Sequence, residues 1–273
     1  MELARNAENG EVYDAVSFDR RSDRDRLRHS LVCLECGADA YFSRSARNGR
    51  SASFGARPHR PDCKHHDSSE AIANTFANLP EAEIREPLEG EFQLRRVDDK
   101  HSGVHLEHDD TAPRPPRGRA RRHTRTGGAA RSLPSRGLRV LLAKLLTEPA
   151  TRSSTDVLHL YDGTTMLIRD ACVHADDVTV QLRNKRRVYW GTIRDARFSS
   201  GTYWINTGRA DQPSIVIAPD ELAQLLRRLK LEHADDLAGA AFIIWGPLRL
   251  SESSGKLLIF ADDLGLLDVL VPK

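Results

Sequence analysis

Three cysteines and a histidine in this 273-residue chain have types and spacing suited to binding a metal ion. Cys33 and Cys36 are separated by two residues, and His59 and Cys63, separated by three, follow after a gap of 22 residues. Two close ligand pairs let a chain fold back and enclose a tetrahedral Zn²⁺, and a closed set of four ligands leaves no position for a reactive water. We therefore predict a structural zinc site at Cys33, Cys36, His59 and Cys63.

The same segment allows other interpretations. His65 or His66 could replace His59 as the fourth ligand, because both lie close to Cys63 in the sequence. The cysteines could instead be small buried apolar residues beside a solvated loop. A further alternative is a zinc-scaffolded nuclease in which His65, His66 or Asp62 activates water, although no nuclease signature surrounds these residues.

Arginines between the metal ligands give this small module a cationic face, for which nucleic acid is a natural partner. They are Arg44, Arg47, Arg50, Arg57 and Arg60. Over about 35 residues the cysteine and histidine pattern is similar to one found beside the nuclease domains of CoiA-like competence proteins. That resemblance implies a zinc-finger-like module.

The three tryptophans of the chain form a second candidate site in its C-terminal half. If Tyr189 points into the core of a sheet, the period of two in a strand turns Trp190 outward, and the same reasoning turns Trp204 and Trp245 outward. Exposed tryptophan beside arginine stacks on unpaired bases, at about 1–3 kcal/mol per base. The predicted nucleic-acid site comprises the three tryptophans, with Trp204 foremost, and Arg183, Arg186, Arg187, Arg194, Arg197 and Arg209. The alternative is that the tryptophans pack beneath residues 138–180 or in a protein interface.

The elements that must position these residues follow from periodicity. Leucines at helical spacing predict a helix over 138–146 that ends at Pro149, and a hairpin is expected around Asp162-Gly163. From 186 to 262 the expected order is strand, strand, strand, helix, strand, strand. This order resembles the OB-fold, a five-stranded Greek-key barrel that binds oligonucleotides or sugars. The matching segments are VYWGTIRDARFSSGTYWINTG, SIVIAPDELAQLLRRLKL and FIIWGPLRLSESSGKLLIFADD.

The resemblance implies a binding domain of the single-stranded-DNA type, with Trp204 on the second strand of the usual binding face. Residues 91–135 are acidic and then rich in arginine, proline and glycine, which predicts a disordered linker. The predicted fold class is α+β: a zinc module at 1–90 with a short helix starting near Ser69, the linker at 91–135, and an OB-like barrel domain with an N-terminal helix and hairpin at 136–273.

Composition limits the function classes. The net charge is +2 and predicts no particular partner, although the basic residues are 34 Arg and 7 Lys. No apolar run approaches the ~20 residues needed to span a bilayer. We expect a cytoplasmic protein of bacterial type without membrane contact. No phosphate-binding glycine loop and no nucleophilic triad can be nominated, so we expect a binding protein and no enzyme. The predicted function is nucleic-acid binding by a zinc-containing protein, with single-stranded DNA favoured as the ligand. A protein-recruiting adaptor is the alternative.

Overall fold

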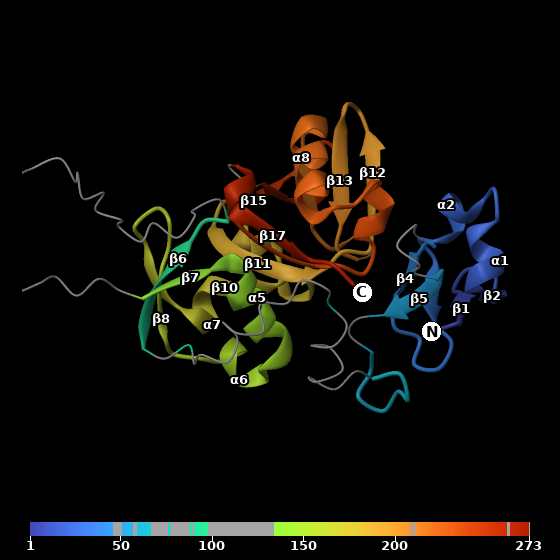
Figure 1. Ribbon diagram of the computed structural model, residues 1–273, viewed down its shortest axis with the longest axis horizontal. Coiled ribbons are helices and arrows are strands. Elements are labelled where there is room, and N and C mark those ends of the chain that lie inside the picture. The colour runs from blue at the N-terminus through green and yellow to red at the C-terminus, as the bar shows by residue number, and fades with distance from the viewer. Residues whose placement is uncertain are drawn as a thin grey trace, which may run out of the picture.

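The computed structural model describes residues 1–45, 51–56, 59–66, 76, 88, 90–97, 134–208, 211–260 and 263–272. Within these residues the fold is mixed α+β, with several sheets and a few mostly short helices. The N-terminal strands lie at one end of the long axis and the sheet that contains β6 and β8 lies at the other (Figure 1). No helix in the described part of the chain is long and apolar enough to cross a membrane.

The N-terminal module, which we define as the described residues between 1 and 66, has a core of its own. The Phe18 ring lies 4.9 Å from that of Phe42 and 5.4 Å from that of Phe54, measured between centroids. The Asp14 carboxylate accepts a hydrogen bond from the backbone N–H of Ser17 and so caps the first helix. The elements are β1 (Leu3–Asn6), β2 (Val12–Asp14), α1 (Ala15–Asp19), α2 (Arg24–Leu27), β3 (Leu31–Cys33), β4 (Ala40–Ser43) and β5 (Ser53–Ala56).

The C-terminal sheet has the predicted order of three strands, a helix and two strands. Its hydrogen-bonded path runs β11-β15-β16-β14-β13-β12, with β14 and β16 parallel and the other pairs antiparallel. The elements are β11 (Arg186–Thr192), β12 (Asp195–Ser199), β13 (Thr202–Asn206), β14 (Ser214–Ile217), α8 (Pro219–Leu229), β15 (Ala241–Leu250) and β16 (Leu257–Phe260).

The ladders of the described residues do not by themselves show the predicted closed barrel: the path of these strands begins at β11 and ends at β12, and β11 and β12 form no ladder with each other. They are successive segments of the chain, separated by Ile193 and Arg194. The backbone N–H of Ile193 donates to Ala240 O, beside β15, whereas that of Arg194 donates to Asn206 O on β13. The chain therefore passes from one part of the sheet to another at these two residues.

Two apolar cores lie on opposite sides of this sheet. The inner core contains Tyr189, Ile205 and Ile244 together with Leu222 and Leu225 of α8. The outer core lies between β11, β15 and α5 (Leu138–Thr147), which packs against β15 and β17 (Leu267–Leu270). In Figure 1, α5 lies below the sheet and α8 above it. The predicted helix over 138–146 is confirmed as α5, and Pro149 begins a new helix after it.

Residues 91–95 form β6 (Glu91–Arg95), a strand where a disordered linker was predicted. β6 pairs in parallel with β7 (Ser135–Gly137) and β8 (Val157–His159). Its alternation explains the difference, because Phe92 and Leu94 are buried while Glu91 and Gln93 are exposed. Residues 98–133 of the expected linker, and most of the helix expected from Ser69, lie outside the described residues.

The remaining elements surround these sheets. The hairpin predicted around Asp162-Gly163 is confirmed, because β8 pairs antiparallel with β9. β10 runs parallel to β11 and extends the larger sheet. The bounds are α6 (Pro149–Arg152), β9 (Thr165–Leu167), α7 (Ile168–Ala171), β10 (Cys172–His174), η1 (Ala175–Asp177), η2 (Val180–Leu182), η3 (Ala234–Leu237) and η4 (Leu264–Leu266).

The N-terminal module packs directly against the C-terminal sheet. Arg28 forms an ion pair of 2.8 Å with Asp235, and the Ser43 hydroxyl donates to Ala238 O at 3.1 Å. Tyr41 packs against Gly239, where a Cβ atom would lie 2.3 Å from the Tyr41 ring. Glycine is therefore required there for this close approach, and also for the backbone φ of +81°. The two parts therefore meet through side-chain contacts that no local sequence pattern predicts.

Candidate metal centre and nucleic-acid interface

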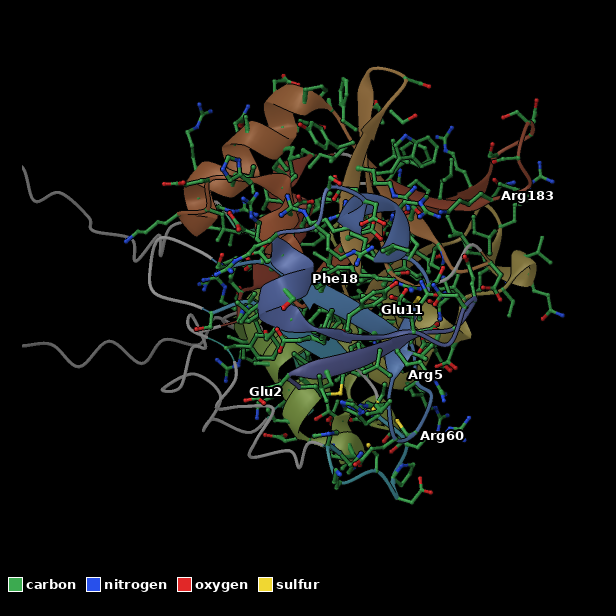
Figure 2. The ribbon with its side chains drawn as sticks, turned by 90° about the vertical axis from the view of Figure 1, so that its right-hand side faces the viewer. Glu2, Arg5, Glu11, Phe18, Arg60 and Arg183 are labelled. Atoms are coloured by element: carbon green, nitrogen blue, oxygen red, sulfur yellow. The ribbon has the colours of Figure 1, made fainter. Side chains whose placement is uncertain are left out.

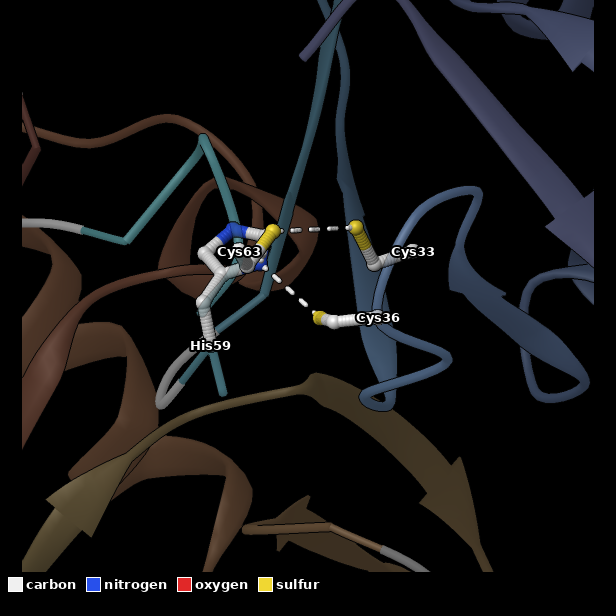
Figure 3. A group of neighbouring side chains, drawn as sticks. All are labelled: Cys33, Cys36, His59 and Cys63. Carbon is white, nitrogen blue, oxygen red and sulfur yellow. Dashed lines mark hydrogen bonds between the residues drawn. The ribbon is translucent and has the colours of Figure 1, made fainter. Parts of the chain in front are cut away.

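The four predicted metal ligands lie together, with their ligand atoms within 4.8 Å of one another (Figure 3). The Sγ atoms of Cys33 and Cys63 are 4.0 Å apart, and His59 Nδ1 lies 3.5 Å from the Sγ atoms of Cys36 and Cys63. A tetrahedral zinc with bonds of about 2.3 Å to sulfur and about 2.0 Å to nitrogen requires separations of roughly 3.8 Å and 3.5 Å. The group can therefore hold a metal ion, and its donor set and spacing fit zinc.

Two turns position the ligands. β3 ends at Cys33, and the turn to Cys36 is closed by hydrogen bonds from Cys33 N to Ala38 O and from Gly37 N to Cys33 O. Gly37 has a φ of +69°, a left-handed conformation that favours glycine. The second pair of ligands follows β5. This local folding explains why the x2 and x3 spacings predict the site.

His59 supplies the histidine of the group, and neither His65 nor His66 belongs to it. The His65 ring lies 5.8 Å from the His59 ring, and its backbone N–H donates to Cys63 Sγ at 3.4 Å. Such an outer hydrogen bond orients a sulfur ligand. The preference for His59 over the later histidines is therefore supported by the arrangement of the cluster.

The thiols of the cluster differ in acidity. Burial raises the pKa of Cys36, but hydrogen bonds from the backbone N–H groups of Arg60 and Ala38 oppose this effect and hold the pKa below its ordinary value. Burial is the main cause that raises the pKa of Cys63. Because a metal binds the thiolate forms, metal loading must release protons.

Two of the three tryptophans are buried, which corrects the prediction that all are exposed. Trp190 and Trp245 are 4% and 2% exposed and belong to the outer core. The guanidinium of Arg152 lies 5.1 Å from the Trp190 ring centroid, and the His174 ring contacts its edge. The direction of both side chains relative to the sheet was predicted correctly. Residues 138–180 cover them, as in the alternative given above, so neither ring can stack on a base.

Trp204 remains partly exposed on a different part of the sheet. The register places Arg197 opposite Trp204 and Trp204 opposite Val216. Val216 in turn lies opposite Phe260, and the Arg249 guanidinium lies 5.7 Å from the Phe260 ring centroid. We call this row, formed by Arg197, Trp204, Val216, Phe260 and Arg249, the Trp204 face. It joins aromatic rings and guanidinium groups across five neighbouring strands, β12, β13, β14, β16 and β15.

A cleft of about 440 Å³ lies beside Trp204, between β12, β13 and the N-terminal module. His29 Nδ1 lies 3.2 Å from a carboxylate oxygen of Asp195, and Asn206 donates to the other oxygen at 2.7 Å. Burial alone would raise the pKa of Asp195, but these two hydrogen bonds outweigh it and hold the pKa low. The lining residues are Glu8, His29, Ser30, Arg194, Asp195, Arg197, Ser199, Trp204, Asn206, Gly208 and Lys256.

The predicted arginines differ in exposure and in their place in the fold. Arg197 is about half exposed beside Trp204, whereas Arg194 is only 8% exposed and donates to the backbone oxygen of His29. Arg183 lies at the edge of the molecule in Figure 2. Arg186 and Arg187 begin β11, opposite Pro247 and Gly246 of β15. Arg209 lies outside the described residues.

The cationic surface predicted for the N-terminal module is described only in part. Arg60 lies beside the cysteine cluster (Figure 2), and its carbonyl accepts a hydrogen bond from Cys63 N. Arg47, Arg50 and Arg57 lie outside the described residues. Sequence reasoning missed His29, Arg249, Lys256 and Phe260. For Phe260 the available signal was its alternation with the buried Ile259.

Comparisons with known proteins give no family assignment. No protein-family model matches the chain. No curated protein sequence matches it either.

Similar solved structures cover about a third of the chain. An OBody bound to hen egg-white lysozyme is 14% identical, with a TM-score of 0.27, over 36% of this chain and 92% of its own. Asparaginyl-tRNA synthetase from Pyrococcus horikoshii is 18% identical, with a TM-score of 0.27, over 37% of this chain and 23% of its own. A chain of the S. pombe Stn1-Ten1 complex is 15% identical, with a TM-score of 0.23, over 31% of this chain and 58% of its own. Similarities with scores this low carry no inference about this chain.

Proposed function

We propose that this protein binds single-stranded nucleic acid, with single-stranded DNA favoured, on the Trp204 face, and that its N-terminal module holds a structural Zn²⁺. The observation that carries this proposal is the strand register, which aligns Arg197 with Trp204 and, through the intervening strand β14, with Phe260. Stacking on aromatic rings and pairing with the charged backbone together bind single strands with little dependence on sequence. The resident zinc acts in folding, since all four of its positions are filled by protein side chains.

A fluorescence titration with oligo-dT at two salt concentrations tests this function. Trp190 and Trp245 are buried, so quenching on binding should come from Trp204. We expect quenching that weakens as salt rises, because each neutralised phosphate releases counterions. The Trp204→Phe variant is the matched control: it should still bind, but without the quenching. Unchanged fluorescence and no mobility shift of the oligonucleotide would contradict the proposal.

The metal assignment has its own test. Elemental analysis of the purified protein should find about one zinc per chain, as expected for one closed four-ligand site. Cys36→Ser should remove the zinc. Cys172→Ala is the matched control, because this thiol lies outside the cluster and burial raises its pKa to about 12. Loss of zinc from the Cys172 variant alone would exclude the assigned site.

A protein-recruiting adaptor is the second candidate, and exposed apolar side chains of the N-terminal module favour it. Leu3 and Val12 are exposed on β1 and β2, and they alternate with the buried Ala4 and Tyr13. They therefore point away from the core of the module. Under this alternative, Leu3→Ser with Val12→Thr should abolish co-purification of a partner protein without changing zinc content or oligonucleotide binding.

A further inference from the structure

The cleft beside Trp204 is built jointly by parts of the chain that are far apart in sequence. Glu8, His29 and Ser30 come from the N-terminal module, whereas the opposite wall comes from β12, β13 and the turn before β16. Its volume of about 440 Å³ lies within the range of small-molecule binding sites, about 300–1,000 Å³. The cleft is therefore large enough to receive a single nucleotide unit.

The wall from the C-terminal sheet offers groups that suit a nucleotide. Trp204 lines the cleft, and its indole N–H donates to Ser199 O at 3.3 Å, which helps to fix the ring. Arg197 lines the same space and is about half exposed. Lys256 Nζ is held 3.2 Å from Asn206 Oδ1. An aromatic ring beside two cations matches a base with its phosphate.

His29 is the group that the N-terminal module contributes. Its Nδ1 is engaged by Asp195, whose side chain is 4% exposed. Its Nε2 has no hydrogen-bond partner among the described residues, although His29 lines the cleft. A histidine held at one ring nitrogen by a carboxylate has its ring orientation fixed, and the other nitrogen is available to a ligand.

We propose, building on the proposed function, that this cleft is a one-nucleotide subsite shared by the two parts of the protein. Trp204 stacks on the base, Arg197 and Lys256 bind the phosphate, and His29 contacts the nucleotide from the N-terminal module. Bound nucleic acid therefore touches the metal-containing module as well as the sheet. This assigns the module a direct contact with the ligand, made by residues other than the arginines between its metal ligands.

Substitution of His29 tests the subsite in the full-length, zinc-loaded protein with fluorescein-labelled oligo-dT as the probe. His29→Ala should weaken binding about 2- to 10-fold, the range for losing one hydrogen bond. Glu8→Gln should strengthen binding at low salt, because it removes a negative charge from the cleft wall. A loss of docking between the two parts cannot produce that gain.

Asp235→Asn is the matched control for docking. It weakens the ion pair with Arg28, which joins the same two parts but does not line the cleft. We expect unchanged affinity in this variant. If Asp235→Asn weakens binding as much as His29→Ala does, the His29 effect comes from undocking and the subsite is refuted.

Photocrosslinking supplies a readout that does not depend on stability. Oligo-dT carrying 4-thiothymidine should crosslink to the peptide that contains His29 and Ser30 as well as to that containing Trp204. Crosslinks confined to the C-terminal sheet, with Trp204-dependent binding intact, would overturn the shared subsite and leave the proposed function standing. Absence of any oligonucleotide binding would overturn both.

Discussion

The same sheet carries outward-pointing tryptophans on two surfaces, one buried beneath other parts of the chain and one beside an open cleft. On β11 and β15, Trp190 and Trp245 point away from the inner core and are buried in a second core. On β13, Trp204 also points away from the inner core, but it borders a cleft. Strand periodicity therefore specifies which side of a sheet a residue occupies. It does not specify whether that side meets solvent or other parts of the chain.

The cause of the difference is what lies above each surface. Helix α5, with leucines at 138, 141, 142 and 145 buried, covers β15 and β17. The β12–β13 region instead faces the N-terminal module, whose contacts at Arg28 and Tyr41 leave the space beside Trp204 open. The two surfaces should therefore respond differently to loss of metal, to truncation and to ligand.

The largest expected difference follows removal of the metal. Chelation, or the Cys36→Ser substitution, should unfold the N-terminal module, because zinc binding contributes about 10–16 kcal/mol in zinc-finger peptides. Trp204 should then lose one wall of its cleft, while Trp190 and Trp245 remain buried. Hydrogen exchange resolved by peptide checks this, with strong deprotection at 1–45 and little change over 186–192. Equal deprotection of both regions would show that they fold as one unit.

Truncation of a buried tryptophan should have the next largest effect. Trp245→Ala leaves a cavity in the outer core and should cost about 3–5 kcal/mol of unfolding free energy. Trp204→Ala, at a partly exposed site, should cost less than about 1 kcal/mol. Urea unfolding monitored by circular dichroism measures both. Similar losses in the two variants would mean that Trp204 is as essential to packing as Trp245.

Ligand binding should reverse that ranking. Trp204→Ala should weaken oligo-dT binding by about 1–3 kcal/mol, the value of one stacked base. Trp204→Phe should retain most of the affinity, since phenylalanine also offers a ring for stacking. Fluorescence anisotropy with a labelled oligonucleotide measures the change. Full affinity in the alanine variant would remove Trp204 from the interface.

The smallest expected effect concerns Arg249, at the far end of the Trp204 face. Arg249→Ala should weaken binding about 2- to 5-fold and reduce the slope of log affinity against log salt by about 1, as for one lost phosphate contact. Arg169, an exposed arginine on α7, provides a control that should change neither quantity. A slope that does not change in Arg249→Ala would place the ligand elsewhere.

Local sequence patterns predicted much of the fold. The leucine spacing predicted α5, Asp162-Gly163 predicted the β8–β9 hairpin, and the strand and helix order from 186 predicted the C-terminal sheet. β6 was missed because its five residues follow a glycine and precede a charged stretch. β17 was missed because its sequence, LDVL, is short and apolar and does not by itself distinguish strand from helix.

The candidate sites also contain residues that local sequence patterns predicted and residues that they missed. The metal ligands were predictable because two tight turns fix each pair locally, so that only the meeting of the pairs required folding. His29 was not predictable. It belongs to no sequence motif with a recognisable spacing. It reaches Asp195 only because the two parts of the chain dock through Arg28, Ser43 and Tyr41.

The ligand spacing, the strand alternation and the order of elements are readable from the chain alone, because they depend on residues that are near one another along it. Which tryptophan meets solvent, and which residues share a cleft, follows from the packing of the whole fold. Those outcomes depend on packing between segments more than a hundred residues apart, such as the contact of Arg28 with Asp235. A local sequence pattern does not predict which distant segments come into contact.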